Sequence, residues 1–136
     1  MKAMADPARA RLTNLRNHLL RLHKTLLDSE RAAYERDVQR ITSTGQYLQL
    51  VLDDPWFAWL HELSQFIVVI DEQLDDKEKP ATPEDADRLT ARARGLIAPS
   101  ESATGNGFRR KYFEAMQRDP DVVLAHRDMV RAFEEL

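Results

Sequence analysis

One run of the sequence, from Asp54 to Leu74 (DPWFAWLHELSQFIVVIDEQL), limits what the chain can fold into more than any other. Its apolar residues recur at spacings of three and four, which is the period of an α-helix, and further apolar residues widen the stripe. The stripe consists of Trp56, Leu60, Leu63, Ile67, Ile70 and Leu74, widened by Trp59, Phe66 and Val69. A helix this apolar cannot face water on every side, so we predict that residues 55–75 form a central buried helix of an all-α bundle or are shared with a partner.

Four prolines each follow a residue that favours the N-cap of a helix. The pairs are Asp6-Pro7, Asp54-Pro55, Thr82-Pro83 and Asp119-Pro120. The carboxylate or hydroxyl of the first residue accepts hydrogen bonds from the free amides of the first turn, and proline fits the first helical position because it has no amide hydrogen to lose there. Asp85, three residues after Thr82, makes a variant of the capping box. The sequence therefore marks four helix starts with the same chemistry.

The spacing of apolar residues predicts six helices and no strands in a single helical-bundle domain spanning residues 1–136. The expected ranges are 7–41, 46–52, 55–75, 82–97, 108–118 and 120–136. The long first helix carries two adjacent apolar stripes, which indicates contact with more than one neighbouring helix. We expect residues 75–80 to be a solvated linker and residues 98–107 (APSESATGNG) to be the most flexible segment.

Composition excludes several classes of protein. The chain contains no cysteine, which excludes disulfides, thiolate catalysis and cysteine-ligated zinc sites. Its first residues, MKAMADPARARL, lack the apolar core of a secretory signal. The longest apolar stretch is interrupted by polar residues and falls short of the roughly 20 residues that span a bilayer. We therefore expect a cytoplasmic protein with no membrane partner.

The charged residues are unevenly distributed along the chain. Residues 9–40 carry eight basic and four acidic side chains, a balance of +4, whereas residues 53–87 carry eleven acidic and two basic ones, a balance of −9. Either these oppositely charged helices pack beside each other, within one chain or across a dimer, or the basic helix binds a nucleic acid. Acidic residues interrupt the basic ones, and phosphate binding requires a continuous positive face, so we favour packing and expect no nucleic-acid partner.

His23, Glu30 and His61 are candidate ligand-binding residues, with Tyr34 or Trp59 lining the site. If the first and central helices are antiparallel, these groups could meet inside the bundle, where His and Glu side chains can hold a metal. The Glu-x-x-His pairs of di-iron bundles are missing, and the run from His61 reads HExxQ instead of HExxH. The alternative is that both histidines edge the core and are satisfied by hydrogen bonds. For Glu30, we expect an ion pair with an arginine over a catalytic role.

Arg109, Arg110 and Lys111 form a second candidate site, for an anion. They follow the glycines of residues 105–107, and glycines before a helix can aim backbone amides at an anion. Three cations in a first turn oppose the helix dipole, so either the acidic linker at 75–78 or a bound phosphate should compensate. No Gly-Lys-Ser/Thr follows, which excludes a P-loop, and the chain has no GxSxG nucleophile motif.

Two stretches resemble segments of a known group of bacterial proteins. Residues 22–35 read LHKTLLDSERAAYE and residues 52–60 read LDDPWFAWL. On these stretches, and again at DPDVVLAH (119–126), the chain resembles a family of short, uncharacterised bacterial all-helical proteins. The resemblance implies a bacterial, cytoplasmic, helical protein and carries no catalytic residue across.

Two functions are expected from these features. The first is a non-enzymatic protein that acts by association, as a homodimer or with a protein partner, because a helix that is apolar on several sides needs cover. The second is a metal- or small-ligand-binding bundle that uses the His and Glu groups of the first and central helices. We assign no catalytic residue and no cofactor, and the sequence names no reaction.

Overall fold

A computed structural model describes residues 6–98 and 107–136 of the chain. All the regular secondary structure of these residues is helical, and turns and loops connect the helices. The order is α1 (Pro7–Asp37), α2 (Thr44–Asp53), the 3-10 helix η1 (Ala58–Leu60), α3 (His61–Asp75), α4 (Pro83–Ile97), α5 (Phe108–Arg118) and α6 (Pro120–Glu135). The predicted all-α bundle with a long N-terminal helix is confirmed. Apart from its two ends, the segment 98–107 that we expected to be flexible lies outside the described residues. None of the described helices has the length and apolarity that crossing a membrane requires.

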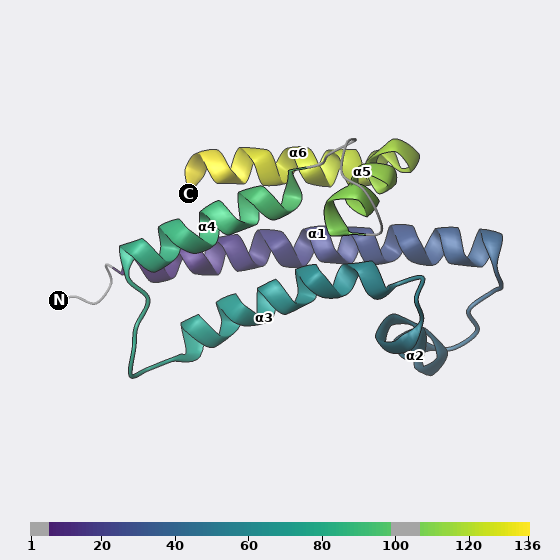
Figure 1. The fold of residues 1–136 in the computed structure, drawn as a ribbon, viewed down its shortest axis with the longest axis horizontal. Coiled ribbons are helices and arrows are strands. Elements are labelled where there is room, and N and C mark those ends of the chain that lie inside the picture. The colour runs from purple at the N-terminus through teal and green to yellow at the C-terminus, as the bar shows by residue number, and fades with distance from the viewer. Residues whose placement is uncertain (1–5, 99–106) are drawn as a thin grey trace.

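Helix α1 is the axis of the bundle, because α3, α4 and α6 all pack along it (Figure 1). In the view of Figure 1, α6 lies above α1 and α3 lies below it, and both run antiparallel to α1. The apolar residues of α1 recur every three or four positions and are shielded by these neighbours. The most deeply buried are Leu12, Leu15, Leu19, Leu22 and Leu26. The prediction that the first helix contacts more than one neighbour is therefore confirmed.

The segment 55–75 departs from the prediction in two respects. Asp54 Oδ1 accepts a hydrogen bond from the Trp56 amide at 2.8 Å and so caps a turn, which continues as η1, and the α-helix begins only at His61. Five apolar residues of α3 are buried as predicted, but Val68 and Val69 remain 52% and 36% exposed on its outer side. Helix α3 therefore flanks the bundle, and α1 takes the central position that we predicted for residues 55–75.

The other three proline-marked helix starts are confirmed, because each N-cap side chain accepts a hydrogen bond from a backbone amide of the first turn. Asp6 accepts at 3.0 Å, Thr82 at 3.1 Å and Asp119 at 2.9 Å. Helix α1 ends at Asp37, four residues before its predicted end. There the Ile41 amide donates to the Glu35 carboxylate at 3.1 Å, which lets the chain leave the helix while Ile41 stays buried.

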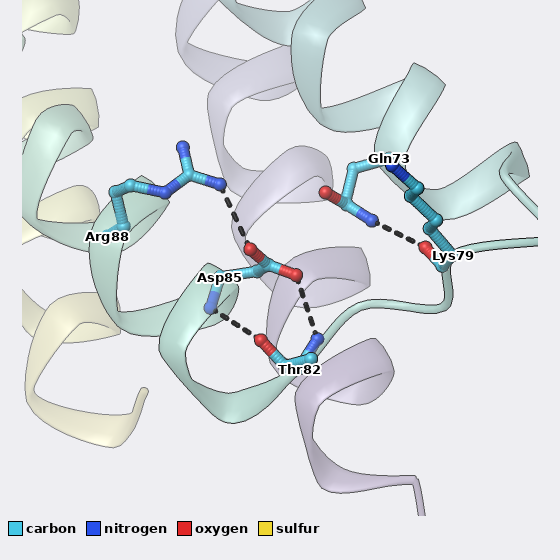
Figure 2. Close-up of polar contacts among 5 residues, drawn as sticks. All are labelled: Gln73, Lys79, Thr82, Asp85 and Arg88. Carbon is cyan, nitrogen blue, oxygen red and sulfur yellow. Dashed lines mark hydrogen bonds and ion pairs between the residues drawn. The ribbon is translucent and has the colours of Figure 1, made fainter.

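Figure 2 shows how the polar connection between α3 and α4 is held. The Thr82 amide donates back to the Asp85 carboxylate at 3.0 Å, which completes the capping box, and Arg88 pairs with the same carboxylate at 3.1 Å. The Gln73 side-chain amide donates to the Lys79 carbonyl at 3.0 Å, which ties the exposed linker to the end of α3. The turn from α3 into α4 is therefore fixed by local hydrogen bonds, although its side chains are exposed.

Oppositely charged helices pack against each other within the chain. Arg16 of α1 pairs with Asp71 of α3 at 3.1 Å, and Arg11 of α1 pairs with Asp87 of α4 at 2.8 Å. The Arg9 guanidinium donates to the Leu74 carbonyl at 2.7 Å and satisfies one of the free carbonyls at the end of α3. The favoured interpretation of the uneven charge distribution is confirmed, because the basic face of α1 is partly neutralised by its own neighbours.

Candidate functional site

A cleft of about 550 Å³ lies between α1, the segment 55–59 and α5. Two indole side chains, Trp56 and Trp59, line it together with Glu30 of α1. Helix α5 adds three charged side chains, which are those of Lys111, Glu114 and Arg118. Because the chain turns at residues 55–57 and forms η1, both tryptophans reach this cleft, and Phe57 between them is fully buried in the core.

Glu30 is the buried charge of the cleft, and only 5% of it is exposed. Arg118 Nη2 donates to Glu30 Oε2 at 3.1 Å and to the Ser29 hydroxyl at 3.3 Å. Burial raises the pKa of the Glu30 carboxyl, while Arg118, a hydrogen bond from the Trp59 side chain and the charge of Lys111 oppose this effect. Burial is the stronger influence, so Glu30 accepts a proton more readily than an ordinary glutamate.

The two tryptophans of the cleft are held by neighbouring rings. The Trp56 indole N–H donates to the Glu30 backbone carbonyl at 3.3 Å, and its ring meets Tyr34 edge-on at a centroid distance of 5.6 Å. The Trp59 ring tilts against Phe108 of α5 at 5.3 Å. Both indoles are half-buried, so each keeps part of its surface open. Their orientation is therefore fixed by packing before any ligand arrives.

The structure separates the predicted ligand residues into two groups. Glu30 and Trp59 line the cleft, and Tyr34 is buried beside Trp56 without lining it. His23 on α1 and His61 at the start of α3 do not line it, and they are close enough for the charge of His61 to affect the pKa of His23. Within residues 6–98 and 107–136, no three His, Asp or Glu side chains form a group that could hold a metal. The described residues therefore do not assemble His23, Glu30 and His61 into one metal site.

The two histidines have surroundings typical of the edge of a core. His61 Nε2 lies 3.0 Å from the Val51 carbonyl oxygen, which only accepts hydrogen bonds, so this nitrogen carries a proton. Burial lowers the pKa of His23, and the charge of His61 lowers it further. His23 is therefore held neutral at physiological pH. For His61, the hydrogen bond to Val51 agrees with the alternative in which the histidines edge the core and are satisfied by hydrogen bonds.

The three cations at the start of α5 do not converge on one anion site. Arg109 Nε donates to the Ala98 carbonyl at 2.9 Å, and Arg110 Nε donates to the Glu114 carboxylate at 3.1 Å. Lys111 instead lines the cleft beside Glu30. We expected the compensation from the acidic linker at 75–78 or from a bound phosphate, and part of it comes instead from Glu114, one turn further along the same helix.

The sequence did not identify Arg118 as a partner in the site. An ion pair between Glu30 and an arginine was expected, and it is confirmed, but the partner lies 88 residues away along the chain. Arg118 is the last residue of α5, directly before the proline-marked start of α6. A helix end at this position was predictable from Asp119-Pro120, whereas its approach to α1 depends on how α5 and α6 dock.

A second candidate surface is the outer face of α2, which we define as Gly45, Leu48, Gln49 and Leu52. Leu48 and Leu52 are 56% and 67% exposed, and α2 contains no buried residue. Its other side, formed by three half-buried apolar residues, packs against the core. Figure 1 shows α2 below α1, toward the C-terminal end of that helix. Helix α2 is therefore apolar on more than one side, as α3 also is through Val68 and Val69, and its exposed leucines are the larger side chains.

Comparisons with protein-family models, with curated proteins and with solved structures found no match to this chain.

Proposed function

We propose that this protein acts without catalysis, by self-association through the outer face of α2. The observation that carries the proposal is the exposure of Leu48 and Leu52, which stand one helical turn apart on the same side. Leucines exposed to this extent on a helix whose opposite side is also apolar leave one side of α2 without cover. A second copy of the chain would supply that cover.

The outer face suits contact with itself. Its four residues are uncharged, and the one charged side chain of α2, Asp53, lies at its C-terminal edge, where it accepts a hydrogen bond from Gln49. In an antiparallel pair the two Asp53 side chains lie at opposite ends of the contact, so they do not face each other. The space around Gly45 is open, which allows a second helix to approach closely. Gly45, Leu48, Gln49 and Leu52 follow the spacing of three and four that one side of a helix presents to another helix. Two copies of α2 can therefore pack antiparallel across a two-fold axis.

The ion pairs of α1 do not support the dimer, because Arg11 and Arg16 already find carboxylates within the chain. The contact would depend on apolar surface alone. Two helices of ten residues cover less area than the roughly 1,200–2,000 Å² of a standard stable interface. We therefore expect a weak dimer whose population rises with concentration.

Sedimentation equilibrium of the full chain tests the proposal. The wild type should shift from monomer toward dimer as the concentration rises to about 1 mM, the range in which weak complexes form. The Leu48→Lys/Leu52→Lys variant should remain a monomer at every concentration. The matched control is Val123→Lys/Val130→Lys, which changes two similarly exposed apolar residues of α6 and should dimerise like the wild type. A wild type that stays monomeric, or a control that loses the dimer equally, would refute the proposal.

A further inference from the structure

We propose that the cleft between α1, residues 55–59 and α5 binds a small planar monocarboxylate, with the carboxylate on Lys111 and the planar apolar body against Trp56 and Trp59. This binding is independent of the self-association of α2, which lies on a different surface. The proposal depends on the size of the cleft, on which of its charged groups already have partners, and on the fixed aromatic walls.

The cleft has the size and composition of a small-molecule site. Its volume of about 550 Å³ lies within the roughly 300–1,000 Å³ that such sites occupy. Two indoles form its apolar walls, and a few charged groups can fix the orientation of a ligand, which is the usual composition of a ligand pocket. Because both rings are packed against Tyr34 and Phe108, a ligand does not have to order them.

The hydrogen bonds already present favour an anion over a cation. The buried Glu30 carboxylate accepts a hydrogen bond from Arg118 at 3.1 Å, and Glu114 accepts one from Arg110 at 3.1 Å. Lys111 Nζ comes no closer than 3.8 Å to a Glu114 oxygen, and it makes no hydrogen bond to any residue in the described part of the chain. The carboxylates therefore have partners, whereas the Lys111 ammonium keeps donors for a ligand.

The flanking carboxylates limit the charge of the ligand to one. Glu30 and Glu114 offset Lys111 and Arg118, so the four charged side chains of the cleft sum to zero. A doubly charged anion such as inorganic phosphate would meet both carboxylates at short range and be repelled more strongly than a single carboxylate. The two indoles favour a flat apolar body, because aromatic rings gain most from offset-stacked or edge-on contact.

The positions of the tryptophans allow a direct test. The chain has two tryptophans, and both line the cleft, so the two indole N–H signals in a ¹H–¹⁵N NMR spectrum report on this cleft alone. The full-length ¹⁵N-labelled chain is titrated with benzoate. Acetate carries the same charge without a ring, and benzylamine has the ring with the opposite charge. Inorganic phosphate lacks the ring and, at the mildly alkaline pH used for all four titrations, is mainly doubly charged. These three probes separate the contributions of ring and carboxylate.

We expect benzoate to shift both indole signals to saturation with a Kd of about 1 mM or lower, and each of the other probes to bind at least about tenfold more weakly. Lys111→Gln should weaken benzoate about tenfold, because it removes a charged hydrogen-bond donor. Arg127→Gln removes the same charge on the exposed side of α6 and should bind benzoate like the wild type. The Leu48→Lys/Leu52→Lys variant should also bind normally, whether or not the wild type dimerises.

The proposal is overturned if benzoate leaves both indole signals unmoved at concentrations about tenfold above the expected Kd. It is equally overturned if benzylamine or phosphate binds as tightly as benzoate, since the assigned ligand charge would then be wrong. A third contrary result is a Lys111→Gln variant that keeps the wild-type spectrum outside the cleft and binds benzoate unchanged.

Discussion

Replacing Arg118 with methionine should destabilise the protein far more than replacing its partner Glu30 with glutamine. Glu30 is 5% exposed and depends on Arg118, at 3.1 Å, for its compensating charge. In Arg118→Met the carboxylate stays buried without that cation. In Glu30→Gln the buried group becomes neutral, and Arg118, whose side chain is 34% exposed, can still be hydrated. The two substitutions break the same ion pair and leave different groups unpaired.

The expected magnitudes follow from this asymmetry. Removing one partner of a fully buried ion pair costs about 3–5 kcal/mol, because the remaining charge has no compensation. Water reaches the Arg118 side of this pair, so we expect a smaller loss of about 2–3 kcal/mol for Arg118→Met. Glu30→Gln loses a charged hydrogen bond but no longer buries a charge, and these effects nearly cancel, to within about 1 kcal/mol. The double variant should resemble Glu30→Gln.

The cost of Arg118→Met should also depend on pH. Burial raises the pKa of Glu30 above its ordinary value of 4.5, so the folded protein binds this proton more readily than the unfolded chain does. Stability from this group is therefore fully present below pH 4.5 and is lost as the pH rises through the raised pKa. Without Arg118 the pKa rises further, so the loss at neutral pH becomes larger. The difference between Arg118→Met and the wild type should shrink as the pH falls.

Urea unfolding followed by circular dichroism measures both effects, at neutral pH and near pH 4.5. We expect the order wild type ≈ Glu30→Gln > Arg118→Met at neutral pH and a smaller gap in acid. Equal losses for the two single variants, or a loss in Arg118→Met that does not change with pH, would show that Glu30 is not the dominant buried charge.

Three further predictions concern the fold. Thr82→Ala removes the side chain that caps α4 and should lower the free energy of unfolding by about 1 kcal/mol, measured by urea titration. Leu22→Ala, on the buried side of α1, should cost about 2–5 kcal/mol, whereas Leu20→Ala, 46% exposed on the same helix, should cost less than about 1 kcal/mol; equal losses would contradict the burial described for α1. Burial and the charge of His61 lower the pKa of His23 below 6.5, so protonation opposes folding. Its contribution to stability is present above pH 6.5 and is lost as the pH falls through the lowered pKa, and His23→Gln should flatten the decline of Tm in that range.

Features that depend on neighbouring residues were predictable from the sequence. The caps at Asp6, Thr82 and Asp119 involve an amide two or three residues away, so residue type and spacing were sufficient. The leucine stripe of α1 was predictable for the same reason, because helical periodicity places its members on one side. These local signals gave the all-α class and most of the helix boundaries.

The turn at residues 55–60 was not predictable from spacing alone. A turn followed by η1 places apolar residues at intervals similar to those of an α-helix, and Asp54-Pro55 can open either structure. Tertiary packing decides between them. Phe57 is fully buried, with its ring 5.8 Å from that of Tyr34 and 6.1 Å from that of Tyr47. Because Phe57 points into the core, Trp56 and Trp59 on either side of it line the cleft.

The candidate site was predictable only in part. Glu30 and Trp59 were singled out, and an ion pair with an arginine was expected for Glu30. The identity of that arginine depends on the docking of α5 and α6 against α1, which brings together residues 88 positions apart. The lack of a shared metal site for His23, Glu30 and His61 has a local cause. His23 and Glu30 are seven residues apart on one helix, which separates them by roughly 10 Å along its axis, too far for one metal ion to bind both.

The central claim is that α1 forms the buried axis of the bundle and that two copies of the chain meet through α2. Amide hydrogen exchange at two protein concentrations tests this claim most directly. We predict that amides of residues 12–26 exchange slowest and at the same rate at both concentrations, whereas those of residues 46–52 exchange faster and become more protected at the higher concentration. Equal protection of α1 and α2 would contradict the architecture, and protection of α2 that does not change with concentration would contradict the proposed dimer.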